Sequence, residues 1–96
     1  MAGAHLEGAW LRGAHLEGAH LNDAHLEDAF LDGAHLEDAF LIDAHLEGAW
    51  LRGAHLDGAN LIGAHLEGVE GLTPAQVERV IGLDVATGVP PGLLRT

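Results

Sequence analysis

The chain contains no cysteine, lysine, serine or tyrosine. Without cysteine it has no disulfide, no thiolate nucleophile and no cysteine-based zinc site. The only hydroxyl side chains are those of three threonines outside the regular part of the sequence, Thr73, Thr87 and Thr96. A His–Glu pair in the regular part would therefore have no hydroxyl or thiol nucleophile to activate. We therefore predict that the protein is not an enzyme and that it carries no cofactor.

Basic residues are scarce as well, because only four arginines accompany 15 acidic residues, and the net charge is −11. Nucleic-acid affinity comes largely from Lys and Arg that neutralise phosphates, so direct binding of DNA or RNA is not expected. No basic segment followed by an apolar run opens the chain, and no stretch approaches the ~18 consecutive apolar residues of a membrane span. We expect one domain in the 96 residues, without membrane contact, and a cytoplasmic location.

What the sequence does contain is a five-residue repeat. From Ala4 to Gly68 it reads Ala-x-Leu-x-(Gly/Asp) in thirteen consecutive units. On an α-helix this period would turn successive leucines by about 140° and spread them around the surface. On a straight strand it would place them on alternating faces. A corner in every unit solves the problem, with Gly or Asp at the second central position of a type II turn, where φ is positive.

The residue before each Leu indicates how many sides the coil has. Histidine occupies this place in every second unit, so the number of sides is even. Two sides cannot enclose a core, whereas four sides give a coil of about 20 residues. Such a coil stacks Trp10 on Phe30 on Trp50, and Ile42 on Ile62.

This pattern resembles that of the pentapeptide repeat proteins, whose repeat is A(D/N)LXX. Residues 4–68 carry the resemblance, although the family's usual Asp or Asn before the Leu is present only as Asn60. The resemblance implies an all-β solenoid, a right-handed quadrilateral β-helix of about three coils, with Ala and Leu inside. The expected core leucines are Leu16, Leu21, Leu26, Leu31, Leu36, Leu41 and Leu46.

The two ends differ from the repeat. We predict a β-helix over residues 1–68 and a cap over residues 69–96, in which Thr73-Pro74-Ala75-Gln76 forms a capping box for a helix over about 74–81, followed by an irregular tail. The N-terminal coil has no comparable cover, because Met1 already occupies an inward Leu place. Either two chains meet there, with Met1 and Leu6 at the contact, or the natural chain is longer.

All four aromatic residues stand at the outward place before Leu. Trp10, Phe30 and Trp50 form one column beside arginines, and Phe40 joins Ile42 and Ile62 on the opposite face. Stacked rings can simply stabilise neighbouring coils, as cross-strand pairs do. Exposed aromatics with Arg are also typical of binding hot spots, so these six residues are candidate interface residues.

Histidines followed two residues later by an acid form two further columns. Solvated His–carboxylate pairs are the simplest interpretation. A pH-dependent charge is a second, because the unperturbed His pKa is about 6.5. Metal binding is a third, with His5, His25, His45 and His65 as weak candidates.

We therefore predict a non-enzymatic structural or interaction module, a rigid rod that binds a protein or associates with itself as a homodimer or larger assembly. The alternative comes from the family resemblance, since some pentapeptide repeat proteins are acidic DNA mimics that bind or protect DNA gyrase, a topoisomerase. The acidity of the chain fits that alternative, whereas its small number of coils makes it short for a DNA mimic.

Overall fold

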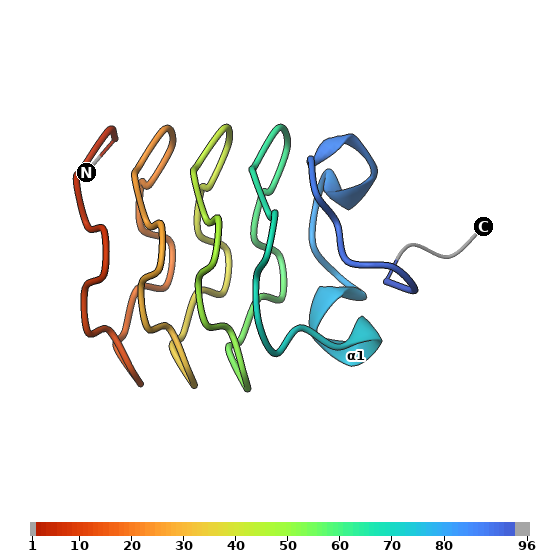
Figure 1. The fold of residues 1–96 in the computed structure, drawn as a ribbon, viewed down its shortest axis with the longest axis horizontal. Coiled ribbons are helices and arrows are strands. Elements are labelled where there is room, and N and C mark those ends of the chain that lie inside the picture. The colour runs from red at the N-terminus through yellow and green to blue at the C-terminus, as the bar shows by residue number, and fades with distance from the viewer. Residues whose placement is uncertain (1, 94–96) are drawn as a thin grey trace.

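The computed structural model describes residues 2–93, so Met1, a predicted interface residue, lies outside the described residues. The chain winds into coils that stack along an axis from the N-terminal to the C-terminal end (Figure 1). The molecule measures 34 × 22 × 21 Å. Within the described part of the chain, no helix is long and apolar enough to cross a membrane.

Parallel bridges join residues that are 20 positions apart. His5 pairs with His25, Trp10 with Phe30, His15 with His35, and His20 with Phe40 before the chain returns to the first side. Each coil therefore has four sides of five residues. Between two turns, each side contributes a single bridged residue. Residues 2–93 therefore form isolated β-bridges, and none of these bridges extends into a strand of several residues. The result is a β-helix solenoid, with hydrogen bonding between coils at every side.

A turn with a left-handed residue makes each corner. The Ala9 N–H donates to the Leu6 carbonyl over 3.0 Å, and Gly8 between them has a φ of 66°. Positive φ at this position is the mark of a type II turn. Asp38 holds the same place with a φ of 60°, which Asp tolerates better than most residues. The corner turns the chain, so that Ala and Leu of every unit face inward.

Three backbone hydrogen bonds connect most sides of the regular coils to the next coil. On the first side, Leu6 N–H donates to the His25 carbonyl over 2.7 Å, and His25 N–H donates to the Ala4 carbonyl over 2.8 Å. Gly8 N–H donates to the Glu27 carbonyl at the corner over 2.9 Å. This pattern satisfies the backbone between coils without help from side chains.

The interior is a stack of leucines and alanines. The leucines from Leu21 to Leu46 are at most 2% exposed, as are most of the alanines beside them. Leu16, expected in the core, is only partly buried, together with Leu6 and Leu11. These three belong to the first coil, whose outer side has no further coil against it in the described chain. Complete burial of the leucines therefore begins at Leu21, on the fourth side of the first coil.

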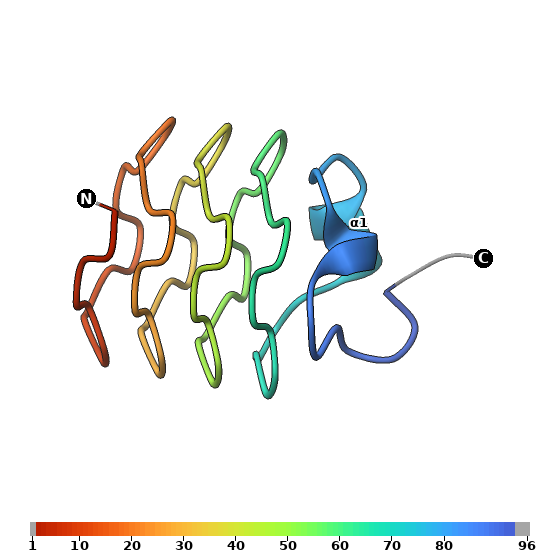
Figure 2. The same cartoon turned by 90° about the horizontal axis from the view of Figure 1, so that it is seen from above.

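Residues 70–87 continue the stack, and they differ from the predicted cap. Helix α1 spans only Pro74–Val77, and a 3₁₀ helix, η1, spans Leu83–Val85. Ile81, predicted within a helix over 74–81, instead forms a bridge with Asn60, and Thr87 forms one with His65. The helix ends early because the chain must return to the coil geometry at Ile81. Figure 2 shows this segment covering the last regular coil.

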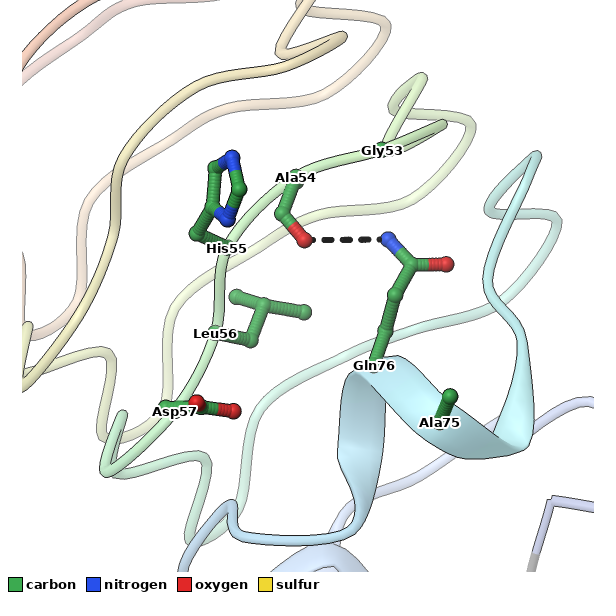
Figure 3. A pocket seen from close by; sticks show the side chains of 7 residues that line it. All are labelled: Gly53, Ala54, His55, Leu56, Asp57, Ala75 and Gln76. Carbon is green, nitrogen blue, oxygen red and sulfur yellow. Dashed lines mark hydrogen bonds between the residues drawn. The ribbon is translucent and has the colours of Figure 1, made fainter.

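Gln76 replaces the hydrogen bonds of the side that α1 displaces. Its Nε2 donates to the Leu51 carbonyl over 2.8 Å and to the Ala54 carbonyl over 3.1 Å, the second of which Figure 3 draws. Its Oε1 accepts from the Thr73 N–H over 2.8 Å. One side chain therefore starts α1 and also satisfies carbonyls of the coil below.

Gly71 is one of the points where the C-terminal segment lies close to the coil below. Its φ is 88°, and a Cβ atom there would lie 2.7 Å from the backbone nitrogen of Arg52. Gly33 has a φ of 67° and no atom within 4 Å of its would-be Cβ. We predict that Gly33→Ala lowers the free energy of unfolding by about 1–2 kcal/mol, the cost of left-handed backbone. Gly71→Ala should lose about 1–3 kcal/mol more through steric overlap.

Urea unfolding followed by circular dichroism measures both variants. Equal losses for Gly71→Ala and Gly33→Ala would contradict the close approach of the two backbones.

Candidate functional site

The aromatic column, Trp10, Phe30 and Trp50, lies on the second side of the solenoid. The Trp10 and Phe30 ring centroids are 4.6 Å apart, and those of Phe30 and Trp50 are 6.1 Å apart. Trp10 is 73% exposed and Trp50 is 41% exposed, while Phe30 between them is partly buried. The predicted column therefore forms, and it presents two large apolar side chains to solvent.

Arg12 lies against this column. Its guanidinium carbon is 5.3 Å from the ring centroids of both Trp10 and Phe30, within the range of a cation–π contact. Its Nε lies 3.8 Å from Oδ1 of Asp32, the residue one coil further on. Arg12 thus links two coils and places a positive charge beside the aromatic rings.

The opposite side carries a mixed column of His20, Phe40, Asn60 and Ile81. The rings of His20 and Phe40 stack with centroids 4.9 Å apart. Phe40, Ile62 and Ile81 are exposed, whereas Ile42 is partly buried. Ile81 enlarges this apolar face and was missed from the sequence, because it follows Asn60 by 21 residues and escapes the five-residue period.

Two histidine columns occupy the remaining sides. The first column is His5, His25, His45 and His65, and the second is His15, His35 and His55. Neighbouring rings within a column are nearly parallel, with centroids 4.5–4.8 Å apart. From His5 to His45, each Nδ1 lies 3.2–3.5 Å from Oε2 of the glutamate two residues later. Since an ionised carboxylate can only accept, Nδ1 is the donor in these pairs.

Hydrogen bonding lowers the pKa of two of these glutamates. The pKa of Glu7 falls below its usual 4.5 because its own backbone N–H and then the His5 side chain donate to the carboxylate. The pKa of Glu17 falls for the same reasons, with His15 as the side-chain donor. Both side chains are about half exposed, so these shifts mark local hydrogen bonds on the surface.

Side chains that could hold a metal ion come together in both histidine columns. Four clusters each combine a histidine, the acid two residues later and the histidine of the next coil, with ligand atoms within 4.8 Å of one another. They are His5–Glu7–His25, His45–Glu47–His65, His15–Glu17–His35 and His35–Glu37–His55. The weak metal candidates predicted from the sequence therefore lie together in pairs, and the second column adds clusters that the prediction did not name.

The first coil leaves backbone groups available at its outer side. Among residues 2–93, the amides of His5, Trp10 and His15 donate to no backbone carbonyl, whereas the equivalent amides of the next coil do. Leu6 and Leu11 are partly exposed at the same end. This surface combines unpaired donors with apolar side chains.

A pocket of about 270 Å³ lies where α1 meets the last regular coil (Figure 3). Its lining includes His55, Asp57 and Gln76. The lining residues include no hydroxyl or thiol side chain, and the Gln76 amide nitrogen is engaged with carbonyls of the coil.

The family model for pentapeptide repeats matches residues 1–38 and 39–70 in eight copies. Among solved structures, the pentapeptide repeat protein Rfr23 from the cyanobacterium Cyanothece 51142 is 38% identical over 82% of this chain, with a TM-score of 0.68. A pentapeptide repeat protein from the Arabidopsis thaliana thylakoid lumen is 25% identical over 91% of this chain, with a TM-score of 0.52.

This chain spans 50% of the cyanobacterial protein and 59% of the plant protein. No curated protein matches it. The similarities confirm the resemblance predicted from the repeat.

The Glu7 shift has a direct test by NMR. Because the pKa is lowered from 4.5, ionised Glu7 favours the folded chain above that pH, and this contribution is lost as the pH falls through the lowered pKa. We predict that the Glu7 side-chain carboxyl carbon titrates below pH 4.5 and that His5→Gln moves its midpoint upward. Glu17, whose donor is His15, is the internal control and should not move. An unchanged Glu7 midpoint in His5→Gln would contradict the assigned hydrogen bond.

Proposed function

Because the chain belongs to the pentapeptide repeat family, a family of structural repeat proteins, we propose that it is a non-enzymatic interaction module. It is a rigid β-helical rod that binds protein, in the first place a second copy of itself. The contact surfaces are the aromatic column, the apolar part of the mixed face and the open first coil. We propose neither a nucleic-acid partner nor a membrane partner. We propose a cytoplasmic location.

The exposure of the aromatic column is the observation that carries this proposal. Stacking on Phe30 covers only one face of each tryptophan, and Trp10 remains 73% exposed. This large apolar side chain is exposed to solvent on a chain whose net charge is −11. Burying such a side chain is worth about 1.5–3 kcal/mol. Tryptophan and arginine are the residue types most enriched in binding hot spots, and Arg12 lies directly beside Trp10.

The first coil supports a second contact. The amides of His5, Trp10 and His15 resemble an unpaired sheet edge, which proteins usually cover or pair. A second copy offers the same row of groups with the same spacing, so two first coils can pair around a two-fold axis. In this arrangement Leu6 and Leu11, partly exposed in one chain, become buried.

The DNA-mimic alternative has less support. Seven of the 15 acidic residues stand two places after a histidine of the two columns. Five of these seven pair with an imidazole. The other two sides expose Trp10, Trp50 and Ile62, which have no counterpart on a phosphate backbone. A mimic of duplex DNA requires a uniformly acidic surface. The four sides of this solenoid do not form such a surface.

The assembly is tested by light scattering after size-exclusion chromatography at micromolar concentrations. We predict that the wild-type chain forms dimers or larger species and that Trp10→Asn with Trp50→Asn weakens association by about tenfold or more. The double variant should keep most of its thermal stability, because neither ring is buried in the core. His25→Asn with His45→Asn, a double change at outward places of another side and outside the first coil, is the matched control and should leave assembly unchanged.

Two outcomes would contradict the proposal. A wild-type chain that is monomeric at every concentration would remove self-association. A tryptophan double variant that assembles normally but melts at a much lower temperature would show that the rings serve only to stabilise neighbouring coils.

A further inference from the structure

Three glutamates of the histidine columns each keep one carboxylate oxygen without a partner. In Glu27, Glu37 and Glu47, Oε2 lies within hydrogen-bond distance of the preceding histidine, while Oε1 is buried and accepts no hydrogen bond. An unsatisfied buried acceptor costs about 1–3 kcal/mol, and more when it is charged. A cation bound at this oxygen would remove the deficit.

Two of these glutamates also lie within reach of a second imidazole. Glu47 belongs to the cluster His45–Glu47–His65, and Glu37 belongs to His35–Glu37–His55. The ring centroids in both pairs of histidines are 4.5 Å apart, closer than the 4.7–4.8 Å of the other stacked histidine pairs. The two clusters in the first coil contain Glu7 and Glu17, and these glutamates are exposed.

From these clusters we propose that the protein has two binding sites for a divalent transition metal ion such as Zn²⁺ or Ni²⁺, at His45–Glu47–His65 and at His35–Glu37–His55. Two imidazoles and one carboxylate are a donor set that suits these metals, whereas Mg²⁺ and Ca²⁺ prefer oxygen ligands alone. The histidine columns lie on the first and third of the four sides, so the two ions would bind on opposite sides of the rod.

Metal binding requires the stacked rings to turn. A Zn–N bond measures about 2.1 Å, so two nitrogens that share an ion lie no more than about 4.2 Å apart. The rings of His45 and His65 are within 2° of parallel, with centroids 4.5 Å apart. Because an imidazole nitrogen binds a metal in the plane of its ring, at least one ring must rotate out of the stack for both to reach one ion. Both side chains are partly exposed, so an ion can reach them from solvent.

The negative charge along the first histidine column also favours the binding of a divalent ion. Glu27, Glu47 and Glu67 follow one another at intervals of one coil on the same side. Like charges opposite one another on neighbouring strands destabilise a sheet. A divalent ion at Glu47 places two positive charges among these carboxylates. The net charge of −11 also raises the local concentration of cations.

Isothermal titration calorimetry of the whole chain with ZnCl₂ or NiCl₂ at pH 7.5 tests the proposal. Two equivalents should bind with micromolar dissociation constants, and MgCl₂ should give no such binding. His65→Gln should remove one equivalent, and His55→Gln should remove the other. The matched control is His20→Gln, because His20 stacks on Phe40 and belongs to none of the clusters. It should keep both equivalents.

Circular dichroism of each variant before titration shows whether the solenoid is intact. Glu47→Gln is a second variant of the first site, nearly isosteric with the original residue, and should weaken binding at that site by at least tenfold. Millimolar or absent binding in the wild-type chain would overturn the proposal. An equal loss in His20→Gln and His65→Gln would do the same, because it would indicate surface histidines acting without a defined site.

Discussion

A left-handed residue at every fifth position is the constraint on which this structure depends. Gly or Asp adopts positive φ at each corner from Gly3 to Gly68. The corner rotates the chain, so Ala and Leu face inward in every unit and the outward residues of successive coils align in columns. The core, the bridges and the candidate sites all follow from it, because each requires the coils to remain in register. A branched side chain at one corner would strain the backbone and displace everything stacked on it.

The repeat was predictable because every unit satisfies the same local demands. Spacing of Ala, Leu and Gly fixes the corner, and the alternation of histidine fixes an even number of sides. The cap was less predictable, since residues 70–87 return to the coil at spacings of 21 and 22 after the helix. The one or two extra residues do not follow the five-residue period. The spacing of Val77, Val80 and Ile81 is also typical of a helix longer than the one that forms. Leu16 packs against the core as predicted but is only partly buried, because burial at the end of a stack depends on what lies beyond it.

The candidate surfaces were predictable as columns but not in their details. Sequence places Trp10, Phe30 and Trp50 on one side, yet only the structure shows that Phe30 is covered while the tryptophans remain exposed. It likewise shows Arg12 against two rings. The unpartnered oxygens of Glu37 and Glu47 depend on side-chain rotation and on contacts between coils. No spacing rule in a single sequence encodes those contacts.

The 20-residue coil makes the surface of this protein sensitive to the size of an insertion or deletion rather than to its position. Removing four whole units shortens the rod by one layer and leaves every column on its own side. Removing a single unit turns all later residues by a quarter of the circumference, which moves histidines under tryptophans and isoleucines under glutamates. The packing of the core would hardly change, because every unit buries the same Ala and Leu. Length can therefore vary freely in steps of a full coil, while smaller steps preserve the fold and scramble what it displays.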